Sequence, residues 1–336
     1  MPDKDILLRV ENLKMYFPAT KTLGGRVTNW VKAVDDISFE VERGKTYGLV
    51  GESGCGKTTT GKCILRINEA TSGHIYYKDM DLVTASKSDI AKIRRKIQLI
   101  FQDPYGSLNP RQSCGDILRE AVVLGPGRHD SKATKERVAE LLQTVELLPD
   151  MADRYPHELS GGQRQRLGIA RALACDPELI VCDEPVSALD VSIQAQIINL
   201  FQKIQKELGL TYVFIAHDLA VVRHIADTIG VMYLGHIVET MDAEEIFTHP
   251  MHPYTKALLS AVPITDYDVE RSRHRILLEG EVPSPIHAPT GCPFHPRCRY
   301  ATEACKHEMP RMKDYGNGHM VACHNTEAAQ KDTVEQ

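Results

Sequence analysis

A glycine-rich loop constrains this chain more than any other stretch. Residues 51–59 read G-E-S-G-C-G-K-T-T, which fits the pattern G-x-x-x-x-G-K-S/T and follows an apolar run typical of a buried strand. Such loops bind phosphate because their glycines let successive backbone N–H groups point inward, while a lysine and a hydroxyl group hold the anion and its metal. The residues predicted to form this phosphate loop are Gly51, Ser53, Gly54, Cys55, Gly56, Lys57, Thr58 and Thr59, with Thr58 as a Mg²⁺ ligand.

The length of the chain indicates a large α/β domain with a smaller appendage. Its 336 residues exceed the roughly 250 to 300 residues at which a single hydrophobic core stops growing. We expect the main domain to cover residues 1–250, with a helical insert at about 104–167. The appendage then covers residues 251–336.

Charge and hydropathy argue against several classes of protein. The net charge of -5 gives no reason to expect a nucleic-acid partner. No apolar run approaches the roughly 18 residues of a membrane span, and the first residues lack a secretory pattern. We therefore expect the chain itself to stay in the cytosol, where its nine cysteines are not expected to form structural disulfides.

The segment before the phosphate loop reads as two strands joined by a long loop. Residues 6–17 alternate in polarity, residues 18–30 are typical of a hairpin loop, and strand character resumes at residues 31–41. Phe17, or alternatively Tyr16, is placed to stack on a purine ring. Ordinary packing within the strand is the competing interpretation.

Four polar side chains directly follow apolar runs that predict buried strands. Asp183 is placed to hold Mg²⁺, and Glu184 to orient or deprotonate an attacking water. Gln102 is placed to reach a metal or that water, and His217 to donate a hydrogen bond to a γ-phosphate oxygen. The competing interpretations are a capping role for the acids, surface hydrogen bonding for the glutamine and a structural role for the histidine.

A second anion site is predicted where a helix begins near residue 161. The segment Leu159-Ser160-Gly161-Gly162-Gln163, called here the signature segment, places a capping serine before two glycines whose N–H groups stay available at the positive end of the helix. Further along the chain, Asp190 lies in a turn that leads into a predicted helix over residues 191–208.

Four cysteines gather near the end of the sequence, at Cys292, Cys298, Cys305 and Cys323. Their spacing is not the C-x2-C knuckle typical of zinc ribbons. Four thiolates in a short, proline-rich segment with little core of its own would be stabilised by a soft metal. The pattern therefore favours a metal centre over free thiols.

These motifs, in this order, resemble the nucleotide-binding subunit of ATP-binding-cassette (ABC) transporters over residues 6 to about 250. The resemblance implies a RecA-like P-loop NTPase fold of the α/β class, with an antiparallel β subdomain and a helical subdomain. It also implies ATP and Mg²⁺ as ligands, and a head-to-tail pair in which each ATP lies between one phosphate loop and the other subunit's signature segment. In such a pair Gln102 would sense Mg²⁺ and the membrane partner, and Asp190 would link the two sites.

The C-terminal part narrows the resemblance. The segments H-P-Y-T-K-A-L-L (252–259), G-E-V-P-S-P (280–285) and G-C-P-F-H-P-R-C (291–298) are similar to the extension of oligopeptide and dipeptide importer ATPases, and the chain resembles their F-type subunit. The implied partners are a D-type ATPase, two integral membrane permease subunits and an extracytoplasmic peptide-binding protein, with the chain on the cytoplasmic face of the membrane. For the four cysteines the resemblance implies a small metal-binding extension with a [4Fe-4S] cluster; Zn²⁺ and free thiols are the alternatives.

Three rival functions stay open at this stage. Nickel importers of the same family share many of these features, so the sequence indicates the family more specifically than it indicates the transported solute. A soluble, non-transport ABC ATPase is disfavoured because such proteins usually carry two cassettes or a long coiled coil. A small-molecule phosphotransferase would leave the signature segment unexplained.

Overall fold

The structure is a computed structural model that describes residues 5–21, 27–126, 130–262 and 275–334. The chain divides into two compact units, each assembled from separate stretches of sequence. Unit 1 comprises residues 1–8, 40–46 and 76–215, and unit 2 comprises residues 9–39, 47–75 and 216–336.

A parallel set of three strands forms the centre of unit 1. β7 (Leu179–Asp183) lies between β6 (Ile97–Ile100) and β8 (Thr211–Ala216), and both pairings are parallel. Every residue of β7 and β8 is buried, which is the apolar run expected of strands covered on both faces. Because parallel strands end at the same edge, the residues that follow β6 and β7 are brought together.

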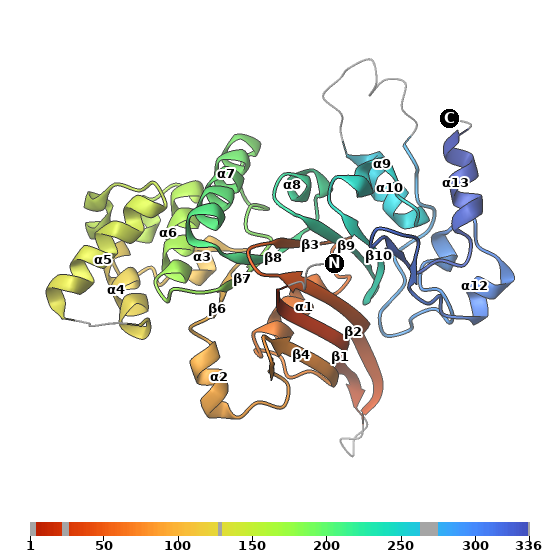
Figure 1. Cartoon of the computed structure of the whole chain (residues 1–336), viewed down its shortest axis with the longest axis horizontal. Helices are drawn as coiled ribbons and strands as arrows, with labels where there is room; N and C mark the ends of the chain where they lie inside the picture. The colour runs from red at the N-terminus through yellow and green to blue at the C-terminus, as the bar shows by residue number, and fades with distance from the viewer. Residues whose placement is uncertain (1–4, 22–26, 127–129, 263–274, 335–336) are drawn as a thin grey trace. The chain divides into compact units, whose positions relative to one another are not determined.

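Helices cover these strands and form a bundle beside them. α4 (Cys114–Leu124), α5 (Ser131–Thr144) and α6 (Gly161–Leu173) pack against one another (Figure 1). Each helix begins after a capping residue whose side chain accepts a hydrogen bond from a backbone N–H of the first turn. The capping residues are Ser113, Asp130 and Ser160. The other helical and strand elements of unit 1 are β5 (Met80–Asp81), α2 (Lys87–Ile93), α3 (Pro104–Ser107), η1 (Pro149–Asp153), η2 (Pro156–Glu158) and α7 (Val191–Leu208).

Aromatic packing fixes α7 on β8. The Phe201 ring meets the rings of Tyr212 and Phe214 edge to face, with centroids 5.6 and 5.8 Å apart. Each such pair contributes roughly 0.5 to 1.5 kcal/mol beyond the burial of its area. The long amphipathic helix predicted over residues 191–208 is confirmed.

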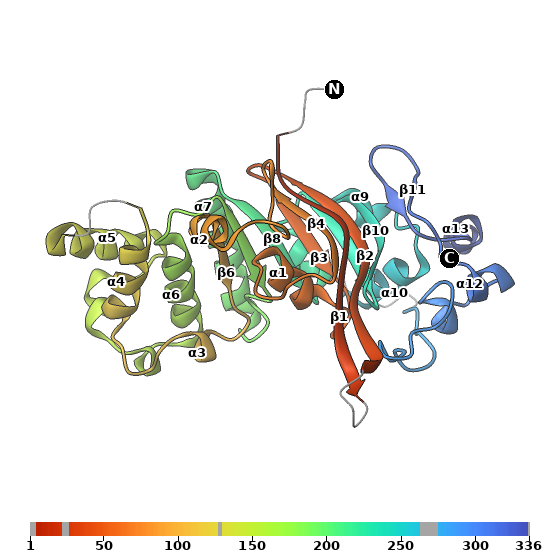
Figure 2. The same ribbon diagram turned by 90° about the horizontal axis from the view of Figure 1, so that it is seen from below.

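Unit 2 contains most of a sheet made of β2 (Val27–Glu42), β1 (Ile6–Lys21) and β4 (Ser72–Tyr77), in that order (Figure 2). The prediction that residues 18–30 form a loop is wrong at both ends. β1 continues to Lys21 and β2 starts at Val27, while residues 22–26 lie outside the described residues. The Thr20 and Thr28 hydroxyls lie 2.6 Å apart, so polar side chains pair across the hairpin where the sequence suggested an irregular turn.

Unit 2 also contributes a run of five adjacent strands to a second sheet, in the order β3 (Thr46–Val50), β9 (Thr228–Tyr233), β10 (His236–Asp242), β12 (Met320–Val321) and β11 (Lys313–Asp314). β3 and β9 are parallel, and the later pairings are antiparallel. The C-terminal region therefore adds two short strands to the edge of β10, which the sequence did not predict.

The helices of unit 2 are mostly short. They are α1 (Lys57–Ile64), α8 (Leu219–Arg223), α9 (Glu245–Thr248), α10 (Pro253–Ala261), η3 (His295–Arg297), α12 (Glu303–His307) and α13 (Thr326–Val334). Among the described residues, no helix has both the length and the apolar character needed to cross a membrane.

Candidate nucleotide-binding and catalytic site

The phosphate loop joins the end of β3 to the start of α1 in unit 2. Gly51 and Gly56 have φ angles of 154° and 112°, which side chains of L-residues rarely tolerate. A Cβ atom on Gly51 would lie 2.1 Å from the Met232 carbonyl oxygen, and one on Gly56 would lie 2.1 Å from the Ala33 carbonyl oxygen. The curled backbone of the loop therefore requires glycine at both positions.

Lys57 starts α1 and is buried, with 3% of its surface exposed. Its ammonium group donates to the carbonyl oxygens of Gly51 and Glu52, at 2.7 and 2.9 Å. The Cys55 N–H makes a long hydrogen bond of 3.3 Å to the Glu52 carbonyl oxygen. Burial raises the pKa of the Cys55 thiol, so this side chain adds no negative charge to the loop. A buried cation beside the N-terminus of a helix gives the loop its affinity for anions.

Two further predicted site residues lie in unit 2. Phe17 lies half-buried in β1, and its neighbour Tyr16 donates a hydrogen bond from its hydroxyl group to Asp35. Burial, together with the hydrogen bond to Asp35, raises the pKa of Tyr16. Because Tyr16 is engaged in this way, Phe17 is the better placed of the two for stacking on a base. His217 is exposed and directly follows β8.

Unit 1 brings the predicted polar residues together at the ends of β6 and β7. Asp183 is the buried last residue of β7, and Gln102 follows β6 by two residues. The Gln102 amide Nε2 donates to Glu184 Oε2 over 2.9 Å. Glu184 has a φ of 45°, an uncommon value for a residue other than glycine. The sequence placed both side chains near the attacking water but did not predict their direct contact.

The signature segment forms the capped helix start that the sequence predicts. The Ser160 hydroxyl accepts from the Gln163 N–H at 3.3 Å, and the Gln163 side chain accepts from the Ser160 N–H at 2.9 Å. A Cβ atom on Gly162 would lie 2.7 Å from Cγ2 of Ile193, so this glycine lets α6 approach α7 closely. Asp190 is exposed and precedes α7, and its side chain makes no capping hydrogen bond.

Contacts to Glu52 from the C-terminal region were not predicted. The Arg297 guanidinium donates to both Glu52 carboxylate oxygens, at 2.8 and 3.2 Å. The Tyr254 hydroxyl oxygen accepts the Glu52 N–H at 2.9 Å. Glu52 and Arg297 are 245 residues apart in sequence, and no local pattern marks them as partners.

The oxygen donors proposed for Mg²⁺ suit that ion. Thr58 offers a hydroxyl, Gln102 an amide oxygen and Asp183 a carboxylate, and Mg²⁺ prefers such hard ligands. A carboxylate buried at the end of a strand is costly unless a cation or a reacting proton uses it.

The four C-terminal cysteines lie near one another without forming a metal site. Burial, and then the nearby thiols of Cys305, Cys323 and Cys298, raise the pKa of the Cys292 thiol to about 12. Within the described ranges, however, no group of three or more Cys, His, Asp or Glu side chains is arranged to hold a metal ion. The structure therefore does not support the predicted metal-binding extension, because sequence spacing does not determine where four sulfur atoms point.

Comparisons with known proteins show the family and the fold. Residues 34–187 match the family described as ABC transporter, and residues 238–305 match the family described as the C-terminal region of oligopeptide/dipeptide transporters. A solved structure described as a dimeric, post-hydrolysis state of the ATP-binding cassette MJ0796 bound to ADP and Pi is 27% identical, with a TM-score of 0.62. The match covers 70% of this chain and 98% of that chain, and it confirms the predicted P-loop ATPase fold.

Curated relatives match almost the whole length of the chain. It is 50% identical over 328 residues to the putative oligopeptide transport ATP-binding protein YkfD of Bacillus subtilis, covering 97% of this chain and 98% of the relative. It is 49% identical over 317 residues to the dipeptide transport ATP-binding protein DppF of Haemophilus influenzae, covering 94% of this chain and 96% of the relative. The chain therefore belongs to the ATP-binding subunits of the oligopeptide and dipeptide ABC transporters, among the F-type subunits, of which DppF and the oligopeptide transport ATP-binding protein OppF of the same organism are examples.

Proposed function

We propose that this chain hydrolyses ATP to power the import of dipeptides or oligopeptides through a membrane ABC transporter. The observation that carries the proposal is the phosphate loop, in which glycines let the backbone curl around the buried cation of Lys57. The names of its relatives, which are oligopeptide and dipeptide transport ATP-binding proteins, supply the substrate class.

Each site residue then has a distinct task. The loop amides and Lys57 bind the β- and γ-phosphates, while the ring of Phe17 stacks on the adenine. Glu184 orients and deprotonates the attacking water, and the Gln102 amide that contacts it holds its carboxylate in place. His217 donates a hydrogen bond to the γ-phosphate.

Thr58, Gln102 and Asp183 would hold Mg²⁺, which would supply positive charge to stabilise the transferred phosphoryl group. The remaining steps belong to the protein side chains.

A second ATPase is the partner that completes each site. In the proposed head-to-tail pair, Ser160, Gly161, Gly162 and Gln163 of one subunit face the ATP held by the phosphate loop of the other, and Asp190 links the two sites. The related MJ0796 cassette is dimeric in its solved structure, which supports this arrangement. A D-type ATPase is the proposed mate, together with two permease subunits and an extracytoplasmic peptide-binding protein. The complex would hold this chain at the cytoplasmic face of the membrane.

A metal at the four cysteines stays a prediction from the residue pattern. Thiolates are soft ligands that suit a [4Fe-4S] cluster or Zn²⁺. The thiols of Cys305, Cys323 and Cys298 lie near enough to Cys292 to raise the pKa of its thiol, which supports proximity. The described residues do not present a ligand set, so no step of the reaction depends on this metal.

Reconstitution tests the proposed function. The chain is assembled with its permease and ATPase partners in liposomes, and ATP-driven uptake of a labelled dipeptide and of a labelled tetrapeptide is measured. Uptake that requires ATP and is lost in Glu184→Gln, while ATP binding persists, supports the proposal. Undiminished hydrolysis in Glu184→Gln would refute the assigned base. Uptake of nickel without uptake of either peptide would refute the substrate class.

A further inference from the structure

Glu52 presents an electrostatic problem inside the phosphate loop. It is the second residue of a loop that must attract the strongly negative phosphates of ATP, and its carboxylate carries the same sign of charge. Its side chain is 27% exposed, so water screens this charge only in part. A like charge at this place opposes the binding that the loop performs.

Arg297 is the counterion that meets this charge. It donates two hydrogen bonds to the two carboxylate oxygens of Glu52, the bidentate geometry that makes an arginine–carboxylate pair strong and directional. Its own side chain is only 8% exposed. Among the described residues, Glu52 is the one carboxylate within ion-pair distance of Arg297.

The surroundings of Arg297 hold it in this position. It belongs to η3, and its guanidinium carbon lies 6.0 Å from the centre of the Tyr233 ring. Tyr233, Tyr254 and Phe294 form a cluster of rings with centroids 4.7 to 5.4 Å apart. This aromatic cluster joins β9, α10 and the C-terminal region, so Arg297 is held by packing as well as by Glu52.

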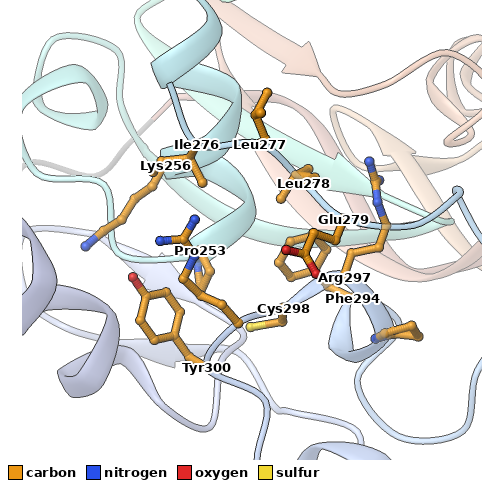
Figure 3. A pocket seen from close by; sticks show the side chains of 12 residues that line it. Pro253, Lys256, Ile276, Leu277, Leu278, Glu279, Phe294, Arg297, Cys298 and Tyr300 are labelled. Atoms are coloured by element: carbon orange, nitrogen blue, oxygen red, sulfur yellow. The ribbon is translucent and has the colours of Figure 1, made fainter. Parts of the chain in front are cut away.

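Arg297 also lines a neighbouring cavity, beside Cys298 and Tyr300. A cavity of about 200 Å³ is lined by α10 residues, residues 276–279 and residues 296–300. Figure 3 shows the Arg297 side chain pointing away from Cys298 and Tyr300, which line the same cavity. The charge of Arg297 is therefore committed to the phosphate loop.

Tyr254 acts on the same residue through the backbone. Its hydroxyl oxygen accepts the Glu52 N–H, and the Lys57 ammonium donates to the Glu52 carbonyl oxygen. Backbone and side chain of Glu52 are thus both held.

We propose that Arg297 is a positioning residue for nucleotide binding: it neutralises Glu52 and holds it away from the phosphates, so that the C-terminal region sets the affinity of the phosphate loop for ATP. The inference rests on the proposed function of that loop. It goes further because it assigns a task in ATP binding to a residue of the C-terminal region.

Equilibrium binding to the full chain tests the inference. The probes are MgADP and the non-hydrolysable MgAMPPNP, titrated by calorimetry at low ionic strength into wild type, Arg297→Ala, Glu52→Gln and the double variant. Arg297→Ala is expected to weaken MgAMPPNP binding by at least about fivefold, the lower end of ordinary coupling between sites. The loss should be smaller for MgADP, which carries less charge, and should shrink as salt is added.

The double variant separates charge from packing. With Glu52→Gln in place there is no charge to neutralise, so adding Arg297→Ala should cause no further loss beyond about twofold. Arg297→Lys keeps the positive charge but loses the bidentate geometry, so its affinity should fall between those of wild type and Arg297→Ala. Arg299→Ala, an exposed arginine two residues away, is the matched control and should also bind as wild type does.

Three outcomes would overturn the inference. The first is wild-type affinity in Arg297→Ala, and the second is an equal loss with and without Glu52→Gln. The third is an Arg297→Lys variant that binds as weakly as Arg297→Ala. If Arg297→Ala does not fold, the lysine variant and the double variant still decide the question. Lys57→Ala tests the proposed function separately, because unchanged binding in that variant would refute the phosphate loop itself.

Discussion

Glu239 anchors the start of α10, and its replacement gives a sharp prediction. Its carboxylate is fully buried, with 0% of its surface exposed. It accepts the N–H groups of Met251 and His252 at 2.7 and 3.0 Å, and it lies 2.7 Å from His319 Nε2. α10 carries Tyr254, whose hydroxyl contacts the phosphate loop, so this anchor supports the nucleotide site.

The size of the effect follows from these three hydrogen bonds. Glu239→Ala leaves all three partners unsatisfied in a buried place. At roughly 1.5 to 3 kcal/mol for each bond to a charged group, the simple sum exceeds 4 kcal/mol. Relaxation and non-additivity reduce it, and we expect a loss of about 3 to 5 kcal/mol, as for a broken buried ion pair. Glu239→Gln keeps one acceptor oxygen and should cost about 1.5 to 3 kcal/mol.

Two assays measure this loss. Calorimetric melting should shift down by roughly 2 to 4 °C for each kcal/mol lost. Hydrogen exchange should rise at the amides of Met251 and His252 before it rises in the strands of unit 1. Glu244→Ala, which removes an exposed carboxylate from the same region, serves as the control and should leave both readouts unchanged.

A free energy of unfolding for Glu239→Ala within about 0.5 kcal/mol of the wild-type value, the usual range of surface substitutions, would contradict this prediction. It also fails if the glutamine variant loses as much stability as the alanine variant. Either result would mean that the hydrogen bonds to Glu239 do not hold α10 in solution.

Three other predictions follow from single contacts. Gly56→Ala should abolish nucleotide binding, because its Cβ atom would lie 2.1 Å from a carbonyl oxygen at a φ of 112°; calorimetric titration with MgADP checks this, and wild-type affinity would contradict it. Ser160→Ala should destabilise α6 by about 1 kcal/mol through loss of its cap; it should also slow ATP hydrolysis in the assembled pair, and a variant that is destabilised but fully active would remove Ser160 from the site. Burial lowers the pKa of His252 to about 4 from an ordinary value of 6.5. As the pH falls, His252 is therefore protonated in the unfolded chain at a higher pH than in the folded chain. Up to about 3 kcal/mol of stability should be lost as the pH falls from 6.5 towards 4. His252→Asn keeps an acceptor for the N-terminus of α10 and should flatten this pH dependence in urea melts, whereas an unchanged slope would show that another group is responsible.

Local sequence patterns predicted the parts of the fold and site that depend on neighbours in the chain. The phosphate loop, the Ser160 cap and the helix over residues 191–208 are each set by residue types within a few positions of one another. The structure therefore places them where composition and periodicity indicate.

The same patterns did not predict contacts between residues that are far apart in the sequence. Gln102 meets Glu184 across 82 residues, and Arg297 meets Glu52 across 245. Neither pair has a periodicity that could mark it. The pairing of β12 with β10 was missed for the same reason, because a strand of two residues carries no alternation to detect. The Thr20–Thr28 contact shows a related limit, since polar side chains paired in a hairpin look like a loop in sequence.

The central claim is that one chain supplies only half of each complete ATP site, and the dependence of hydrolysis on concentration tests it most directly. Specific ATPase activity is measured while the purified chain is diluted, and again as its ATPase partner is added. We predict almost no activity for the diluted chain alone, and a rise on addition of the partner that is markedly reduced when this chain carries Ser160→Arg. A specific activity that stays constant on dilution, and is indifferent to both the partner and Ser160, would contradict the account.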